Sequence, residues 1–256
     1  MIVRRSKKEL DKMAAAGQVV AETLSVMEEN IKVGITTGEL DSVAERHIRS
    51  RNAVPAFLGY NGFPASICAS INNEVVHGIP DRNREIRDGD IVSVDVGAIV
   101  AGYYGDAAKT FAVGTISPEA AKLLEVTEAA LTRGIAQCVS GNRLSDIGAA
   151  IQRHAESFGF SVVRRYVGHG IGRRMHEDPP VPNYGEPGRG PVLKTGMVLA
   201  IEPMINVGGH DVATLGDEWT VVTADGSLSA HFEHTVAIGK NGPVILTALH
   251  EEAKVD

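Results

Sequence analysis

The sequence predicts an α/β fold built from two related halves, each with two helices followed by β-strands. Apolar residues recur at helical spacing in some segments and alternate with period two in others, which separates helices from strands. A helix-and-strand succession occurs twice, and the second copy follows the first at a constant spacing of 107 residues. With 256 residues, 43% of them hydrophobic, the chain can bury a full core as one large domain or two fused halves.

The spacing holds in two separated segments. Gly34 and Gly141 precede His47 and His154 by the same interval, and residues 88–95 match residues 195–202 at the same offset. One offset shared by two segments indicates internal duplication. We therefore expect one domain over residues 1–256, duplicated as approximately 1–114 and 115–256, with no N-terminal extension domain. The two histidines are interpreted as paired structural residues rather than ligands.

Capping signals place the helices. Ser6 with Glu9 forms a capping-box pair ahead of a first helix, and Thr36 with Glu39 forms another ahead of a second. In the second half, Ser117 followed by proline begins a helix that we expect to reach about residue 139. A fourth helix is expected over about 144–158, with a glycine stop at 159.

Alternation places the strands. Residues 91–113 alternate around Gly102 and predict a β-hairpin, whereas residues 55–80 are rich in Gly and Pro and predict loops. Further strands are expected near 161–167, 197–207, 219–223 and 229–238. Asp225-Gly226 predicts a hairpin turn between the last two of these.

Composition excludes several classes of protein. No apolar run approaches the roughly 18–20 residues that span a bilayer, and the basic N-terminus lacks the apolar region of a secretory signal. Two cysteines cannot form a disulfide framework, and a net charge of −7 argues against nucleic-acid specificity. We expect a cytoplasmic monomer without a membrane partner. Arg4, Arg5, Lys7 and Lys8 form either a solvated first turn or a transient ribosome contact.

Four carboxylates lie in otherwise apolar strands, each beside small residues: Asp95, Asp106, Glu202 and Glu233. One such residue alone is usually a surface group or half of a salt bridge. Four together need cations, and these strands carry almost no lysine or arginine on the same face. Two divalent metal ions would balance the charge.

His169, flanked by glycines that allow close backbone approach, is the natural fifth ligand. Two Asp, two Glu and one His suit Mn, Fe(II), Co or Zn in a two-metal hydrolytic site better than a closed structural zinc site.

Five motifs give the chain a family resemblance from end to end. In chain order they are NEVVHGIP at 73–80, the Asp95/Asp106 hairpin, GHGIG at 168–172 continuing through residues 175–177, IEPM at 201–204, and SAHFEHT at 229–235. The chain resembles the type I methionine aminopeptidases of the short bacterial kind. The resemblance implies a pita-bread fold, with two pseudo-twofold-related halves around a central antiparallel sheet. It also implies a single catalytic domain that removes the initiator methionine from nascent polypeptides with a small second residue.

The resemblance assigns roles to residues of this chain. The metal ligands are Asp95, Asp106, His169, Glu202 and Glu233, and His77 and His176 line the reacting centre without binding metal. We expect a water or hydroxide that bridges the metal ions to attack the methionyl carbonyl while the free α-amino group binds one metal. His176 would stabilise the tetrahedral intermediate, and Glu202 would carry a proton to the leaving amine.

A narrow apolar pocket is expected for the methionine side chain. Residues matching the family's pocket positions are Tyr60, Phe63, Cys68, His77, Met175, His176 and Trp219. Met175 stands where other members often have Phe. A strict two-residue turn at Asp225-Gly226 would place Trp219 and Glu233 on opposite faces of a sheet. Either that turn is longer or bulged, or Trp219 does not line the pocket.

Three other functions compete with this interpretation. Proline-directed peptidases and creatinase-like proteins resemble the same catalytic half but usually carry a separate N-terminal domain. A non-catalytic interaction protein on this scaffold would have lost ligands, and all five are present. A metal-dependent phosphoesterase would share the ligand types, but the sequence has no Gly-rich phosphate loop ahead of a helix.

Overall fold

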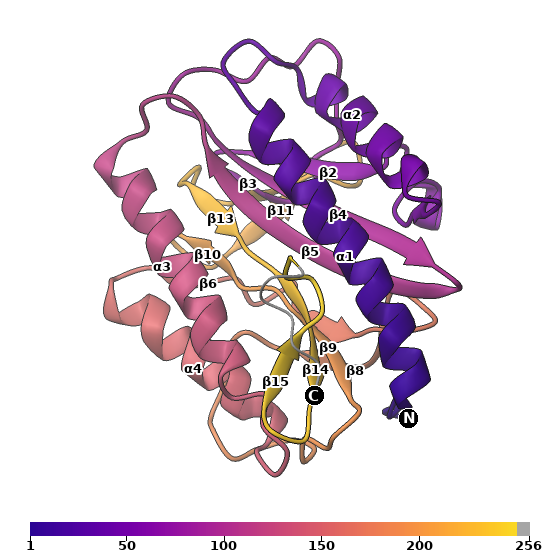
Figure 1. Cartoon of the computed structure of the whole chain (residues 1–256). Coiled ribbons are helices and arrows are strands. Elements are labelled where there is room, and N and C mark those ends of the chain that lie inside the picture. Colours follow the sequence, from indigo (N-terminus) through magenta and orange to yellow (C-terminus); the bar gives the residue numbers. More distant parts are fainter. Residues whose placement is uncertain (250–256) are drawn as a thin grey trace.

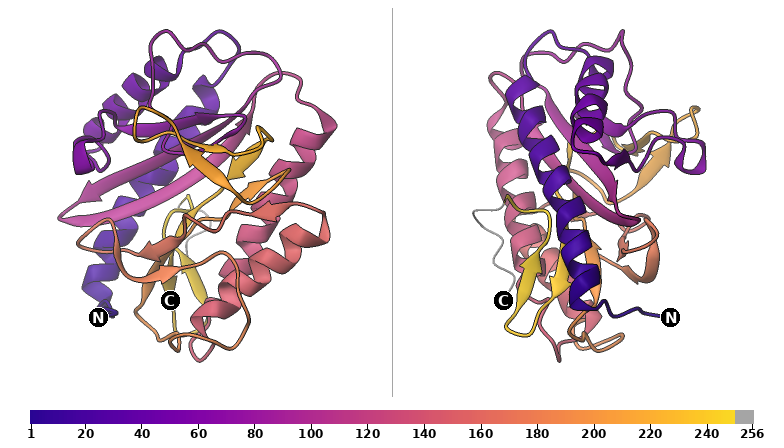
Figure 2. Two further views of the ribbon diagram at one scale, coloured as in Figure 1. Left: turned by 180° about the vertical axis from the view of Figure 1, so that it is seen from behind. Right: turned by 45° about the vertical axis from the view of Figure 1, so that its right-hand side comes forward.

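Two pairs of helices cover one side of a set of antiparallel strands (Figure 1). The computed structural model describes residues 1–249, so the end of the expected 1–256 domain lies outside the described residues. The helices are α1 (Lys7–Asn30), α2 (Thr37–Ser50), α3 (Pro118–Ile135) and α4 (Leu144–Ser157). Seen from behind, the strands lie in front of the helices (Figure 2).

The strands form four hydrogen-bonded sheets, and every pairing in them is antiparallel. In one sheet, β4 (Ile91–Val100) pairs with β5 (Tyr103–Ala112), β2 (Ile67–Ile71) and β1 (Val54–Pro55). The largest has the order β15 (Pro243–Ile245), β14 (His234–Ile238), β9 (Val198–Ile201), β7 (Gly168–Gly170), β8 (Glu177–Val181). Two smaller sheets are β13 (Ser229–His231), β10 (Met204–Asn206), β6 (Ser161–Val162), and β11 (Val212–Thr214), β12 (Val221–Thr223), β3 (Glu74–Val76).

The predicted hairpin at 91–113 is confirmed. β4 and β5 pair in unbroken register from Ile91 opposite Ala112 to Val100 opposite Tyr103. Ala101 and Gly102 both have positive φ, at 49° and 76°, as a type I′ turn requires. The regular register matters for the site, because it fixes which residues of the two strands share a face.

The predicted helix starts are confirmed, with Thr36 and Ser117 as N-caps. α4 ends at Ser157, and Gly159 follows at a φ of 82°. α3 ends at Ile135, so the expectation that it reaches residue 139 was wrong. The chain turns there so that the Gly141 N–H donates to the Leu193 carbonyl. The region 55–80 also differs from a pure loop, because it contains β2, β3 and the short helix η1 (Tyr60–Gly62).

Equivalent features recur in the two halves. The N-caps of α2 and α4, Thr36 and Arg143, each form an isolated β-bridge, to Glu85 and Val192 respectively. β4 and β9 begin at residues 91 and 198, which are separated by the same interval. We propose that these correspondences record an internal duplication with its boundary near residue 115.

Separate apolar clusters lie under each helix pair. One joins α1 and α2 to β4 and β5, and another joins α3 and α4 to β9, β10 and β13. A third cluster, which includes Phe63, Cys68 and Met175, lies between the two halves. No helix among residues 1–249 has both the length and the apolar character needed to cross a membrane.

Candidate metal centre

Asp95 and Asp106 come from the two strands of the hairpin. Asp95 pairs with Ala108, and Asp106 pairs with Gly97, so the two carboxylates are diagonal neighbours on one face. The small partners leave space beside each carboxylate. On the other edge of β4, Asp95 pairs with Cys68 of β2, which brings that thiol to the same region.

His169 occupies the middle of β7, between β8 and β9. Its Nε2 lies 3.7 Å from Asp106 Oδ2 and 3.6 Å from Glu202 Oε1. Its Nδ1 lies 3.0 Å from the Gly170 carbonyl oxygen, a contact in which the protonated Nδ1 donates and leaves Nε2 free as a ligand. A Cβ on Gly168 or Gly170 would lie within 2.3 Å of a backbone oxygen of a neighbouring strand. The flanking glycines therefore let three strands approach closely around His169.

Glu202 and Glu233 lie in strand breaks, so the expected continuous strands 197–207 and 229–238 were wrong. β9 ends just before Glu202, and β14 begins just after Glu233. Each segment connects the five-stranded sheet with a three-stranded one. The two breaks lie side by side, because β9 pairs with β14 and β10 pairs with β13. The Glu233 N–H donates to the Ala108 carbonyl of β5, which ties one break to the hairpin.

Buried oxygen atoms without partners mark the centre. Among the described residues, Asp95 Oδ1, Asp106 Oδ1 and Glu233 Oε1 have no hydrogen-bond partner. One ligand atom each from Asp106, His169 and Glu233 can be enclosed within 4.8 Å of one another. Buried polar atoms are nearly always paired in folded proteins, so these oxygens need a partner that the protein chain does not supply. An oxygen-rich set with one imidazole fits divalent metal ions.

The electrostatics support the same conclusion. Burial raises the pKa of Asp95, Asp106, Glu202 and Glu233. The charge of Asp95 raises the pKa of Glu202 further, and that of Asp106 does the same for Glu233. Burial also lowers the pKa of His169 to about 4, which keeps its imidazole neutral and able to bind metal. Without cations, the negative charges of these carboxylates repel one another.

One pocket of about 200 Å³ contains every residue that the sequence assigned to the site. These residues are Tyr60, Phe63, Cys68, His77, Asp95, Asp106, His169, Met175, His176, Glu202, Trp219 and Glu233. Sequence reasoning missed two further lining residues, Phe57 and Asn61, which flank the predicted Tyr60 in the chain. It also gave no role to His231, although that histidine lies within a quoted motif and its Nε2 is 3.9 Å from Glu202 Oε2.

The predicted hairpin at Asp225-Gly226 was wrong. Gly226 does form a turn, with a φ of 76°, but β12 and β13 belong to different sheets. Alternation along one flat hairpin therefore does not relate Trp219 to Glu233. The Trp219 ring packs edge-on against the rings of Phe63 and His77 inside the pocket. The distances between ring centroids are 5.0 Å to Phe63 and 6.4 Å to His77.

The two auxiliary histidines reach the pocket in different ways. His77 has a left-handed backbone, with a φ of 61°, and burial lowers its pKa to about 4. The His176 ring lies tilted beside that of His169, with ring centroids 4.3 Å apart, and its Nδ1 lies 2.7 Å from the Tyr60 hydroxyl. The Tyr60 hydroxyl therefore fixes the orientation of the His176 ring.

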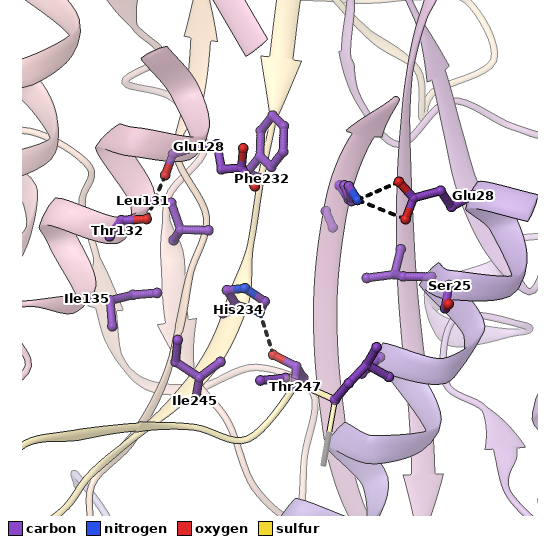
Figure 3. Close-up of a pocket in the computed structure, with 16 residues that line it drawn as sticks. Ser25, Glu28, Glu128, Leu131, Thr132, Ile135, Phe232, His234, Ile245 and Thr247 are labelled. Carbon is purple, nitrogen blue, oxygen red and sulfur yellow. Dashed lines mark hydrogen bonds and ion pairs between the residues drawn. The ribbon is translucent and has the colours of Figure 1, made fainter. Parts of the chain in front are cut away.

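A second pocket, of about 330 Å³, lies between α1 and α3 (Figure 3). His234 points into it, and its Nδ1 lies 2.9 Å from the Thr247 hydroxyl. Glu28 binds Lys109 at its rim with both carboxylate oxygens. None of the five predicted ligands lines this pocket. The neighbours Glu233 and His234 thus serve different cavities.

The N-terminal arm also contacts the site region. Arg5, which the sequence grouped with a basic start, is buried and forms an ion pair with Glu177. Glu177 in turn accepts hydrogen bonds from the backbone N–H groups of Arg173 and Arg174. These contacts hold the loop that carries Met175 and His176.

Known proteins share this sequence and structure. Residues 11–240 match metallopeptidase family M24. Methionine aminopeptidase of Clostridium acetobutylicum is 59% identical over 96% of this chain and 99% of its own length. Methionine aminopeptidase 1 of Bacillus subtilis is 55% identical over 96% of this chain and 99% of its own length.

Solved structures agree with these relatives. Methionine aminopeptidase of Thermotoga maritima superposes with a TM-score of 0.96 at 46% identity, over 97% of this chain and all of that one. The prolidase of Pyrococcus furiosus, at 21% identity and a TM-score of 0.75, covers 97% of this chain and 66% of its own, and shares the fold. These likenesses confirm the predicted pita-bread fold.

Proposed function

This chain belongs to metallopeptidase family M24, and from that membership and the geometry of its site we propose that it is a methionine aminopeptidase. It is a metal-dependent hydrolase that removes the initiator methionine from new polypeptides whose second residue is small. The observation that carries the proposal is a single pocket with two sides. Acidic groups and His169 line one side, and Phe63, Cys68 and Met175 line the other.

The residues of this chain fit two divalent ions. Unpartnered buried oxygens of Asp95, Asp106 and Glu233 face a region that also receives His169 Nε2 and the Glu202 carboxylate. We propose these five as the ligands and Fe(II), Mn, Co or Zn as the metals. When bound, such ions polarise a carbonyl oxygen and acidify water. Their charge also removes the mutual repulsion that raises the pKa values of the carboxyl groups.

Glu202 is suited to move a proton. One of its oxygens lies 3.6 Å from His169 Nε2, and the side chain remains open to the pocket. It can therefore accept a proton from the attacking water and deliver it to the leaving amine.

His176 is suited to bind the oxygen of the scissile amide. If its Nδ1 accepts from the Tyr60 hydroxyl, its Nε2 carries the remaining proton and donates to the developing oxyanion. His77, on the Trp219 side of the pocket, is placed to hydrogen-bond the substrate backbone.

The methionine side chain is recognised by shape and polarizability. Cys68 and Met175 are buried sulfur-bearing residues, and Phe63 and Trp219 form an edge-to-face aromatic pair. Burial raises the pKa of the Cys68 thiol well above its ordinary value, so it stays neutral against a thioether. An unbranched apolar side chain fits such a surface without strain.

We propose that the substrates are the N-termini of nascent chains in the cytoplasm and that the enzyme acts as a monomer. A ribosome contact would use Arg4, Lys7 and Lys8, because Arg5 is occupied by Glu177. The segment contains no acidic residue before Glu9, so these three side chains present a local positive charge.

The activity is tested with metal-free protein. Fe(II), Mn, Co and Zn are titrated separately against Met-Ala-Ser, with an X-Pro peptide as the competing substrate. We expect cleavage of Met-Ala-Ser only when metal is present. Preferred cleavage of the X-Pro peptide would instead assign the chain to the proline-directed peptidases.

The role of His176 is tested by His176→Ala. Its kcat should fall by about 100- to 1,000-fold, the usual effect of losing an oxyanion donor. Metal affinity, measured by calorimetry, should stay within about threefold, because His176 is not one of the proposed ligands. His154→Ala, a histidine on α4, is the matched control. Near wild-type kcat in His176→Ala would exclude the oxyanion role.

A further inference from the structure

His231 is a buried polar residue whose role is not explained by the proposed mechanism. It ends β13 with only 1% of its surface exposed. Its Nε2 has no hydrogen-bond partner among residues 1–249. Leaving such a group unsatisfied costs free energy that a leucine would not, so the structure must use this nitrogen or tolerate a defect.

The backbone of His231 is held firmly. Its N–H donates to Thr110 Oγ1 at 2.9 Å, and the Thr110 hydroxyl donates to its carbonyl at 2.8 Å. Ser93 Oγ, also buried, lies 2.8 Å from Thr110 Oγ1. On the other side, His231 pairs with Met204, two residues beyond Glu202. The imidazole is therefore fixed relative to the strand break that carries Glu202.

Glu202 has its two oxygens in different surroundings. Oε1 lies 3.6 Å from His169 Nε2, on the side of the proposed ligands. Oε2 lies 3.9 Å from His231 Nε2. That separation exceeds a hydrogen bond by roughly 1 Å. The terminal carboxylate torsion of glutamate has a broad minimum, so a rotation of the carboxylate can close the gap at little cost.

We propose that His231 is a positioning residue for Glu202, whose Nε2–H donates to Glu202 Oε2 and thereby turns Oε1 toward the metals and the reacting water. A neutral imidazole has one N–H to donate, and Glu202 is the acceptor within reach. The inference rests on the proposed function, because it concerns the orientation of the group that moves the proton. It adds a residue outside the five ligands and the two auxiliary histidines.

Two substitutions of His231 test the proposal. His231→Leu removes the donor and keeps an apolar side chain, whereas His231→Gln keeps an N–H near the original position. We expect kcat to fall by about 10- to 100-fold in His231→Leu, the usual effect of losing an outer partner of a metal ligand, with KM within about threefold. His231→Gln should retain kcat within about threefold.

His234→Leu is the matched control. His234 is half-buried next to Glu233, but its side chain points into the pocket between α1 and α3 (Figure 3). We expect this variant to lower the melting temperature through the lost contact with Thr247 and to leave kcat near wild type. If His231 served only to fill space, His231→Leu would also keep its kcat.

A measurement on metal-free protein separates the inference from the proposed function. Imidazole ¹⁵N and ¹H resonances of His231 are compared in wild type and Glu202→Leu. We expect the Nε2–H signal to shift upfield in the variant, because the substitution removes the side-chain oxygen that accepts this hydrogen bond.

The outcomes are distinguishable. An unchanged Nε2–H signal, wild-type kcat in His231→Leu, or an equal loss in His231→Gln and His231→Leu would each overturn the positioning role. Failure of the wild-type protein to cleave any methionyl peptide would overturn the proposed function instead. The resonance comparison remains informative if His231→Leu does not fold.

Discussion

Replacing Asp95 by asparagine should stabilise the metal-free protein and weaken its response to metal. Asp95 is enclosed by β2, β4 and β5, and one of its carboxylate oxygens has no partner in the described chain. Asparagine has nearly the same shape but no charge. The same substitution should therefore raise the stability of the metal-free protein and reduce the stability that added metal contributes.

The magnitude follows from the ionisation of Asp95. Burial raises its pKa from 3.8 to about 7. At 1.36 kcal/mol per pKa unit, ionising it above pH 7 costs the metal-free protein up to roughly 4 kcal/mol. Asparagine introduces an amide that also lacks full hydrogen bonding, which offsets about 1–3 kcal/mol. We expect a net gain of about 1–3 kcal/mol, or a rise of a few degrees in Tm.

The variant should gain less stability from added metal than the wild type does. Metal at about 100 times its Kd adds about 2.7 kcal/mol to the stability of the wild type. If the variant binds metal 100-fold more weakly, the same concentration adds only about 0.4 kcal/mol. Urea unfolding with a chelator and with added metal, for both proteins, measures all four free energies of unfolding.

The pH dependence gives a second check on the sign. The folded pKa of Asp95 lies above its unfolded value, so the protonated group favours the folded state at low pH and ionisation weakens that state as pH rises. The advantage of Asp95→Asn in the metal-free protein should be largest above pH 7 and should vanish toward pH 4. Asp41→Asn is the comparison, because burial also raises the pKa of Asp41, but its Oδ1 accepts the N–H groups of Ser66 and Ile67, so this variant should gain less. The reasoning would be refuted if Asp95→Asn lowered the free energy of unfolding of the metal-free protein. It would also be refuted if added metal stabilised the variant as much as it stabilises the wild type.

Two further substitutions test the fold and the specificity pocket. Glu9 accepts hydrogen bonds from the Ser6 backbone, the Ser6 hydroxyl and the Tyr103 hydroxyl, which lower its pKa to about 2. Its stabilisation is present above pH 4.5 and is lost as pH falls toward 2, so Glu9→Gln should cost about 1 kcal/mol in urea unfolding at pH 7 and less below pH 4. Met175→Ala should lower kcat/KM for Met-Ala-Ser about tenfold by enlarging the pocket, and should improve relative cleavage of an N-terminal phenylalanyl peptide in a competition assay. Unchanged selectivity would place Met175 outside the contacts that recognise the side chain.

Local features of the chain could be predicted from the sequence because interactions between residues close in the sequence determine them. Ser117 followed by proline predicted the start of α3, and the alternation around Gly102 predicted the β4–β5 hairpin. The register of that hairpin, which places Asp95 and Asp106 on one face, came from the structure. Glycines on both sides of His169 indicated a close approach of strands, and a Cβ there would meet neighbouring backbone.

The sequence by itself determined which carboxylates lie among apolar strands, and only the tertiary structure decided where Trp219, His231 and His234 lie relative to them. Alternation assigns a face only while a strand continues, and the chain changes sheets at Glu202 and at Glu233. Trp219 lies in the pocket with Glu233 because β12 and β13 belong to different sheets, although counting along a hairpin would have separated the two residues. The change of sheet at Glu233 also directs His231 toward Glu202 and His234 into the opposite cavity. The packing of one sheet against another sets the directions of these side chains, and the alternation of residues along a single strand does not encode that packing.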